Sequence, residues 1–441
     1  MQTNTKRSFA HVTTAGGAQA YPHMKPIQAL RRSVLSCLLW ESEFYESGQE
    51  IAKRIETLAA QVTPQELAAL AIEARSTHNL RHVPLILLKA LAKHGGKIVG
   101  DTIAETIQRA DELAEFVSVY WSPEKQKLSK QVKLGLARAF RKFSEYNLAK
   151  YDRAKAVRLR DVLFMVHAKP KDEAQAAVWK RLVDNDLQTP DTWEVALSTG
   201  KDKKETFERL IREGQLGYLA VLRNLRNMTQ AGVDTTLIRD AILARKGAQR
   251  VLPFRYVAAA RACPQMEPAL DQALSDAIAD LPQFTGKTAV LVDVSPSMDV
   301  ALSGKSDLSR MDAGCALASM IPGDVRMFSF SNQVVEVPPR RGMAGVDALK
   351  RSQPHNGTRL FDAIEAVNRE VKYDRLIVIT DEQDTGGVVK ACPDPKGIGY
   401  MINVASAKNG VGYGKWTHLD GFSEGVLRWI HAVENDAQAT G

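Results

Sequence analysis

The strongest constraint on the fold is a change of hydrophobic period close to residue 281. Before it, apolar residues recur at three- and four-residue spacing in one short segment after another, and no strand pattern interrupts them. After Leu281-Pro282, short continuous apolar runs alternate with helical stretches. We therefore expect two domains, a helical one over residues 1–283 and an α/β one over residues 284–441.

The helical domain is predicted to be an α-solenoid of stacked helix pairs, of the HEAT or armadillo kind. Turn signals such as His94-Gly95-Gly96 and Thr189-Pro190 separate its segments, and Ser122-Pro123 is a candidate helix start. No clean repeat of about 40–47 residues aligns along it. The expected helices lie at 83–93, 101–119, 124–148, 160–167, 173–185, 204–213, 217–227 and 235–245.

The second domain is predicted to be a doubly wound, mostly parallel sheet, because its strands are continuous apolar runs with helices between them. The expected strands lie at 288–294, 325–330, 334–337, 375–380 and 399–405. Helices are expected at 309–320, 358–371 and 423–434.

Polar side chains gather where strands of this sheet end. The first strand ends in a DxSxS motif, Thr358 precedes a helix, and Asp381 follows the strand RLIVIT. Doubly wound sheets bind ligands at the carboxyl ends of their strands. Two carboxylates and three hydroxyls form an all-oxygen set suited to Mg²⁺, whereas a cluster of caps and turns is the alternative. The predicted ligands are Asp293, Ser295, Ser297, Thr358 and Asp381.

The same residues give little reason to expect catalysis. A metal-dependent phosphohydrolase would use Asp293 and Asp381, but the motif supplies no general base. Glu382 and Asp384 lie nearby in the sequence and could be misread as one. We expect a protein that is not an enzyme.

Positive charge is concentrated in one part of the helical domain. The chain has a formal net charge of +8, and the segment 122–173 alone holds 14 Lys and Arg against six Asp and Glu. From residue 284 onward 17 basic residues face 19 acidic ones. A concentrated basic surface suits a polyanion such as nucleic acid, although a solvated helix face is the ordinary alternative.

Helical spacing divides this segment into two faces. Val132, Leu136, Phe140 and Phe143 fall on one side of a helix, which we expect to be buried. The basic residues cluster on the other side. We expect nucleic acid to contact Lys127, Lys130, Lys133, Arg138, Arg141, Lys142 and Arg153. From its position alone, His167 fits a histidine that ends a helix.

The DxSxS, Thr and Asp pattern resembles the metal-ion-dependent adhesion site of von Willebrand factor A domains. The match is Asp293, Ser295, Ser297, Thr358 and Asp381, with no departure, and the resemblance covers about residues 286–436. It implies a divalent cation, held directly by the serines and threonine, with an open position that takes a carboxylate from a partner protein.

The helical domain resembles the TROVE module of Ro ribonucleoproteins. Because the chain has little room for insertions, the resemblance is to the compact bacterial or phage-type form. The segments that carry this resemblance are RRSVL at 31–35 leading to FYESG at 44–48, QRADEL at 108–113, LAKY at 148–151, RDVL at 160–163 running to His167 and Pro170, and AVLRNLRNM at 220–228.

The Ro resemblance implies a ring of HEAT-like helices closed by the α/β domain. It implies that a small noncoding Y-type RNA binds the outer basic surface, where Lys150 and His167 match the family's positions, and that single-stranded 3′ ends of misfolded structured RNAs enter the hole. It also suggests an exoribonuclease as partner and a monomeric ring. The rival reading is a protein-binding adaptor that uses Mg²⁺ to capture a partner's carboxylate.

The remaining composition favours a cytoplasmic protein. Four scattered cysteines without CxxC spacing indicate neither a zinc ribbon nor a disulfide framework, and the N-terminus lacks the apolar core of a secretory signal. No apolar run reaches the roughly 18 residues of a membrane span. Trp40, Trp121, Trp179 and Trp193 are interpreted as core residues and Cys315 as buried and inert.

Overall fold

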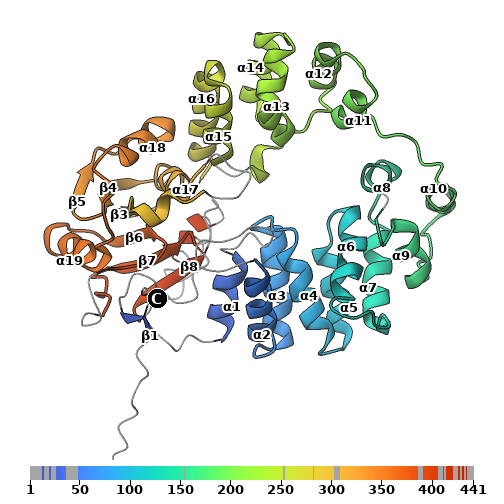
Figure 1. The fold of residues 1–441 in the computed structure, drawn as a ribbon, viewed down its shortest axis with the longest axis horizontal. Helices are drawn as coiled ribbons and strands as arrows, with labels where there is room; N and C mark the ends of the chain where they lie inside the picture. Colours follow the sequence, from blue (N-terminus) through green and yellow to red (C-terminus); the bar gives the residue numbers. More distant parts are fainter. Residues whose placement is uncertain are drawn as a thin grey trace, which may run out of the picture.

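The structure, a computed structural model, describes residues 12–13, 19–20, 26–35, 48–152, 155–251, 254–281, 283–301, 308–385, 391–405, 411, 414–420, 426–427, 430–431 and 434. The helices and an α/β domain are arranged in a ring (Figure 1). The sheet lies between the last helices of the solenoid and its first helix α1, which contacts the final strand β8. None of the described helices is long and apolar enough to cross a membrane.

The first helical block, α1–α10, stacks its helices in two layers. Odd-numbered helices from α1 to α9 contact one another in series, and α2, α4, α6, α8 and α10 form the second series. This is the layering of a helical solenoid. The bounds are α1 (Pro26–Leu35), α2 (Gly48–Ala59), α3 (Pro64–Ser76), α4 (Val83–Ala92), α5 (Lys97–Thr106), α6 (Ala110–Tyr120), α7 (Lys130–Phe140), α8 (Glu145–Tyr151), α9 (Leu159–Val166) and α10 (Glu173–Asp184).

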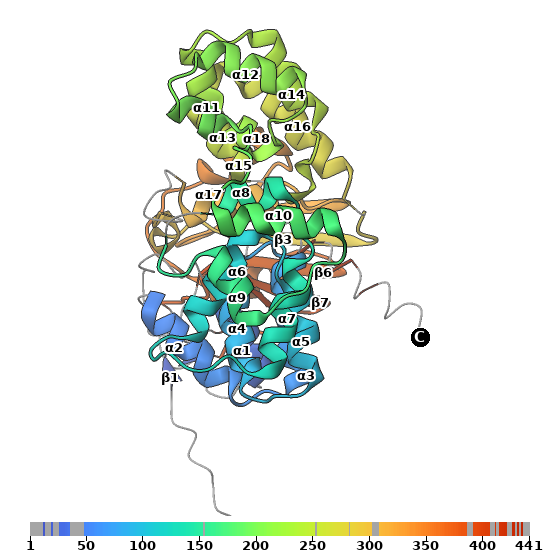
Figure 2. The same ribbon diagram turned by 90° about the vertical axis from the view of Figure 1, so that its right-hand side faces the viewer.

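The second helical block, α11–α16, continues the ring beyond α10 and stands apart from the first stack in the turned view (Figure 2). Its outer layer is α12, α14 and α16, whereas α13 and α15 lie toward the middle of the ring (Figure 1). The bounds are α11 (Trp193–Ser198), α12 (Lys203–Arg212), α13 (Tyr218–Gln230), α14 (Thr235–Ala244), α15 (Phe254–Ala262) and α16 (Glu267–Ala279), with short 3₁₀ turns η1 (Ala248–Arg250) and η2 (Pro264–Met266).

Two long helices expected from the sequence are each divided. The expected helix 101–119 breaks after Thr106, because the Glu112 side chain accepts hydrogen bonds from the backbone amides of Gln108 and Arg109 and starts α6 there. The expected helix 124–148 begins only at Lys130, where Ser129 caps α7, and restarts at Glu145 behind a second cap, Ser144. The prediction that Ser122-Pro123 starts a helix is therefore wrong.

Two short strands correct the expectation that the first 280 residues contain none. β1 (Val12–Thr13) pairs antiparallel with β2 (Gln19–Ala20). Each has only two residues, too few for the alternation of side chains that identifies a strand in a sequence.

The α/β domain contains a six-stranded sheet in the order β5-β4-β3-β6-β7-β8, parallel except for the edge strand β5. This confirms the predicted doubly wound, mostly parallel sheet. The strands are β3 (Lys287–Asp293), β4 (Asp324–Phe330), β5 (Val334–Val337), β6 (Arg375–Thr380), β7 (Ile398–Asn403) and β8 (Trp416–Asp420), and between them lie η3 (Pro296–Asp299), α17 (Arg310–Ala318), α18 (Gly342–Lys350) and α19 (Leu360–Glu370).

Two of these elements escaped the sequence analysis for local reasons. α18 carries Gly342 and Gly345, which are poor helix formers, and is held by its packing against α16 and α17. β8 reads WTHLD, in which polar residues break up the apolar run expected of a buried strand. Both are fixed by tertiary contacts rather than by local pattern.

The ring has two separate helical cores. One belongs to the first block and runs from Leu30 to Leu182. The other begins at Phe207 in the second block and continues through α17 onto one face of the sheet, as far as Ile430. A third cluster packs α19 on the opposite face of the sheet, around Leu291 and Val378. The second block and the sheet are thus one hydrophobic unit.

Candidate functional site

The predicted metal ligands lie at the point where the sheet reverses its strand order. From β3 the chain proceeds to β4 on one side and then crosses to β6 on the other. Asp293 ends β3, and Asp381 directly follows β6, the strand that pairs parallel with β3. A crevice outside the carboxyl ends of two such strands is the usual ligand site of doubly wound sheets.

Hydrogen bonds hold the first ligand group in place. Asp293 is fully buried; its Oδ1 accepts from the Ser295 backbone amide at 2.8 Å, and its Oδ2 accepts from the Thr380 hydroxyl at 2.6 Å. The Ser295 and Ser297 hydroxyl oxygens lie 3.1 Å apart. The DxSxS turn therefore directs a carboxylate and two hydroxyls to one place.

Thr358, which precedes α19, is held at the same edge by the loop that follows β6. Its carbonyl oxygen accepts two hydrogen bonds from Thr385, one from the backbone amide at 2.9 Å and one from the hydroxyl at 2.7 Å. Thr358 is buried, as is Asp381, whose Oδ1 accepts from the Gln383 amide at 3.3 Å. The three sequence segments thus converge, as the motif spacing predicts.

The electrostatics of this edge fit a cation. Burial and the neighbouring Asp381 carboxylate raise the pKa of Asp293 to about 7. The two carboxylates repel each other when both are ionised, and hydroxyl oxygens surround them. Such a set of oxygen donors is suited to a hard divalent ion. The residues present therefore fit Mg²⁺, with Ser295, Ser297 and Thr358 as its hydroxyl ligands and Asp293 and Asp381 as its acidic ones.

The two other acidic residues of this region have structural partners. Glu382 accepts hydrogen bonds from the Asn403 side chain and the Val411 amide, and its carboxylate lies 2.6 Å from His418 Nε2. Asp384 accepts from the Phe361 amide, the start of α19. Sequence reasoning missed Thr380, which binds Asp293 directly; its place as the last residue of β6, one before Asp381, was the available signal.

A second site is a groove on the first helical block, between the 121–128 loop, α7 and the end of α9. Its volume is about 660 Å³. None of the described residues that line it is acidic. They are Trp121, Lys125, Gln126, Lys127, Leu128, Lys133, Phe164, Met165 and His167. Three predicted RNA contacts, Lys127, Lys133 and His167, are thus brought together from three elements.

The groove also contains residues that sequence reasoning did not assign to a site. The Lys125 ammonium lies 4.5 Å from the centre of the Trp121 ring, and the indole Nε1 donates to the Gln126 carbonyl. Phe164 is 59% exposed although it lies on an apolar helix. Trp121 was interpreted as core; it is half-buried at the groove, whereas Trp179 is a core residue as predicted.

Three other predicted RNA contacts have partners within the protein, although they are exposed. The Lys142 ammonium donates to the backbone carbonyls of Ala104 and Ile107 at the end of α5, and burial lowers its pKa. Arg138 forms an ion pair with Asp101 at 2.5 Å, and Arg141 donates to the Lys169 carbonyl. These three cations stabilise neighbouring turns of the block.

Of the remaining predicted contacts, Lys130 and Lys150 do not line the groove. Lys130 is exposed at the start of α7. Lys150 lies on α8, with its ammonium 5.7 Å from the ring centre of Tyr146, and Arg153 lies outside the described residues. His167 is exposed and ends α9 in a left-handed conformation, φ 50° and ψ 44°. Glycine or asparagine is usual at such a position, so a histidine there is unusual.

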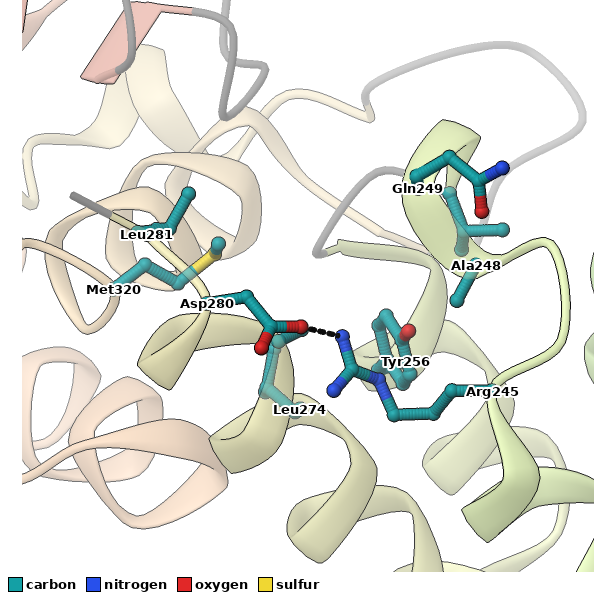
Figure 3. Close-up of a pocket in the computed structure, with 10 residues that line it drawn as sticks. Arg245, Ala248, Gln249, Tyr256, Leu274, Asp280, Leu281 and Met320 are labelled. Atoms are coloured by element: carbon teal, nitrogen blue, oxygen red, sulfur yellow. Dashed lines mark hydrogen bonds and ion pairs between the residues drawn. The ribbon is translucent and has the colours of Figure 1, made fainter.

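A smaller cavity of about 290 Å³ lies where the second block meets the α/β domain (Figure 3). Arg245 at the end of α14 and Asp280 after α16 form an ion pair of 2.6 Å across it, and Tyr256 and Met320 contribute to its wall. None of the predicted site residues lines it.

Part of the second helical block is similar to a known domain. Residues 185–279 match the sequence model of the TROVE domain. Two curated relatives, both named "Telomerase protein component 1", from Rattus norvegicus and Mus musculus, are each 34% identical to it over 76 residues, which are 16% of this chain and 3% of those proteins. The chain therefore spans a small fraction of these relatives' length.

The fold of the whole ring is that of a Ro protein. The crystal structure of the Ro (RSR) protein of Deinococcus radiodurans matches with a TM-score of 0.62 and 18% identity, over 92% of this chain and 99% of that one. The recognition of a Ro-like helical ring with an α/β domain is confirmed. The TROVE match coincides with the second helical block, whereas the basic groove lies outside the matched residues.

Proposed function

We propose that this chain binds RNA and acts as the protein component of a ribonucleoprotein, without being an enzyme. The observation that carries the proposal is the groove at Lys125, Lys127 and Lys133, which is cationic and aromatic and has no acidic lining residue among those described, in a ring with a TROVE domain. Lysines on such a surface release condensed counterions from phosphates, which gives tight but salt-sensitive binding. A Y-type small noncoding RNA, bound through its backbone near Lys150 and His167, is the proposed ligand of this outer surface.

Single-stranded 3′ ends of misfolded structured RNAs are the proposed ligands of the middle of the ring, in noncoding-RNA quality control. Arg223 on α13 and Arg255 on α15 are exposed on the two inner helices of the second block. Although Arg255 is exposed, partial burial and the nearby Arg223 charge lower its pKa. Two like charges held close together favour an anion between them. We propose further a monomeric, cytoplasmic protein that cooperates with an exoribonuclease.

A salt series tests this function. RNA affinity is measured from 50 to 300 mM salt for a structured RNA with a single-stranded 3′ tail and for the same RNA without the tail. We expect a steep salt dependence for both and tighter binding of the tailed RNA. Lys150→Ala and His167→Ala should weaken the outer contact and leave the preference for the tail unchanged. Shallow salt dependence without any preference for the tail contradicts the proposal.

A second function is supported by the metal edge of the α/β domain. We propose that Mg²⁺ held at Asp293, Ser295, Ser297, Thr358 and Asp381 captures a carboxylate of a partner protein, as in the adhesion site that the motif resembles. The buried, mutually repelling carboxylates support it. Ser295→Ala together with Ser297→Ala should abolish Mg²⁺-dependent protein binding while RNA affinity is retained. Protein binding that persists in a chelator contradicts this function.

A further inference from the structure

The basic groove differs from a surface that only neutralises phosphates, because it combines cations with exposed apolar rings. Phe164 projects from α9 with 59% of its surface exposed, the largest exposed fraction among the exposed large apolar residues of the described chain. Trp121, Leu128 and Met165 contribute further apolar surface to the groove. A bare phosphate backbone gives no reason for an exposed phenyl ring, which costs free energy in water.

The cations lie around these apolar groups. Lys127 and Lys133 line the groove, and neither forms an ion pair within the described part of the chain. Lys125 already lies over one aromatic ring, that of Trp121. His167, whose left-handed backbone ends α9, presents an exposed imidazole to the groove. Aromatic faces beside basic side chains are the combination that binds unpaired nucleotides, because the base stacks while its phosphates are neutralised.

The groove has the size for such a ligand. Its volume of about 660 Å³ is within the roughly 300–1,000 Å³ typical of small-ligand sites. A duplex offers its bases only within the stack, so a base can enter only where the RNA has a bulge, a loop or an end.

We propose that this groove is a binding site for a single unpaired nucleotide of a bound RNA, with its base stacked on Phe164 and its phosphates held by Lys127 and Lys133. The proposal rests on the RNA-binding function proposed above and adds to it a point of discrimination: structured RNAs with an unpaired nucleotide at the right position bind more tightly than fully paired ones. His167 and Lys125 also line the groove.

The experiment uses the full chain and three RNA hairpins of equal charge in the duplex. One contains a single bulged uridine, the second has an abasic nucleotide at the bulge, and the third is fully paired. The abasic nucleotide keeps the phosphate and removes only the base. Dissociation constants are measured for the unmodified protein and for Phe164→Ala, Phe164→Tyr and Leu134→Ala. Leu134 is a matched control, since it is 40% exposed on α7 and does not line the groove.

We expect removal of the base to weaken binding by about five- to a hundred-fold, the range for loss of one stacked base. Phe164→Ala should cause the same loss with the bulged RNA, and with this variant the uridine and abasic RNAs should bind equally, which is the signature of direct coupling. Phe164→Tyr should restore the difference, because tyrosine also stacks. Leu134→Ala should change none of the three constants.

Four results overturn the proposal, and they separate it from the proposed function. If the uridine and abasic hairpins bind the unmodified protein equally, or Phe164→Ala weakens all three hairpins alike, the groove holds no base, whereas salt-sensitive binding of the paired hairpin still supports the RNA-binding function. If no hairpin binds, both fail. If an acidic peptide containing an aromatic residue binds in a Phe164-dependent way and the bulged RNA does not, the groove is a protein-docking site.

Discussion

The two helical blocks are built from the same stacked pairs but differ in what their cores join. The first block has a core of its own, which ends at Leu182. The core of the second block runs on through α17 into the sheet. The TROVE match covers the second block, while the surplus positive charge lies on the first. The second block is thus joined to the sheet through a shared hydrophobic core, whereas the charged surface belongs to the first block. Each of these two features can be changed without the other.

The largest expected effect comes from reversing the charge of the groove in the first block. The triple variant Lys125→Glu, Lys127→Glu and Lys133→Glu should weaken RNA binding by roughly a hundred- to a thousand-fold at 50 mM salt, because each lost phosphate contact lowers the salt slope by about 0.9. Affinity titrations over a salt series measure both quantities.

A matched variant in the second block tests whether the effect is local. Lys201→Glu, Lys203→Glu and Lys204→Glu change the net charge of the chain by the same amount, and all three lysines are exposed at the start of α12 and just before it. This variant should lower affinity by less than about ten-fold. Equal losses in the two variants mean that the total charge of the chain, not the groove, governs binding.

The contact between the second block and the α/β domain should be weakened by a substitution of Asp312, on α17. Arg261 of α15 donates two hydrogen bonds to this carboxylate, at 2.8 and 2.6 Å, and Lys350 of α18 lies 2.5 Å from it. Asp312→Asn should lower the free energy of unfolding by about 2–3 kcal/mol. We expect this loss to be smaller than for a fully buried ion pair, because the Arg261 side chain is 41% exposed. Chemical denaturation measures it, and Glu336→Gln, which breaks an exposed pair with Arg326, should cost less than about 1 kcal/mol.

The stabilisation provided by the Asp312 carboxylate should depend on pH. Burial acts to raise the pKa of Asp312, but the hydrogen bonds from Arg261 and Lys350 outweigh it and hold the pKa below the ordinary 3.8. Its contribution is therefore complete above the unfolded-state pKa and is lost as the pH falls below about 3.8. The difference in stability between the unmodified protein and Asp312→Asn should shrink over that acidic range.

A further prediction concerns Mg²⁺ at the edge of the sheet, beside Asp293 and Asp381. Mg²⁺ at about ten-fold its dissociation constant should stabilise the folded protein by about 1.4 kcal/mol. Thermal denaturation with and without the ion measures this, and Asp381→Asn should remove the difference. Stabilisation that survives Asp381→Asn would place the ion elsewhere. RNA binding at the groove should be unaffected, because the two sites lie in different core units.

The contrast between the units also explains what could be read from the sequence. The sheet edge was predictable, because Asp293, Thr358 and Asp381 each follow or precede an apolar segment whose place in a doubly wound sheet is fixed by topology. The groove was predictable only as a basic region. Charge counting cannot tell that Lys142 caps α5 whereas Lys133 lines the groove, since both lie on the same 130–142 stretch.

The exposure of Phe164 could not be predicted from the sequence either. Its neighbours Leu163 and Val166 are buried, and nothing in the apolar run LRDVLFMV distinguishes the one ring that faces solvent. Phe164 shares the groove with the loop at 121–129, where the sequence predicts a helix from residue 124 onward. The position of a loop relative to a neighbouring helix is a tertiary fact, which helical periodicity does not contain.

The smallest expected effect separates binding from stability within the first block. His167 holds a left-handed backbone conformation that glycine adopts without strain. His167→Gly should therefore raise the unfolding free energy by about 0.5 kcal/mol, or leave it unchanged, while the loss of the imidazole weakens RNA binding by roughly three- to ten-fold. Asn79→Gly is the control, since Asn79 has φ 54° in the turn after α3 and does not line the groove. It should leave RNA affinity unchanged. A His167→Gly protein that is both less stable and weaker in binding would show that the histidine acts by ending α9 rather than by contacting RNA. A protein of unchanged stability with weaker binding places the strained residue at the binding surface, where strain is retained because the side chain is needed.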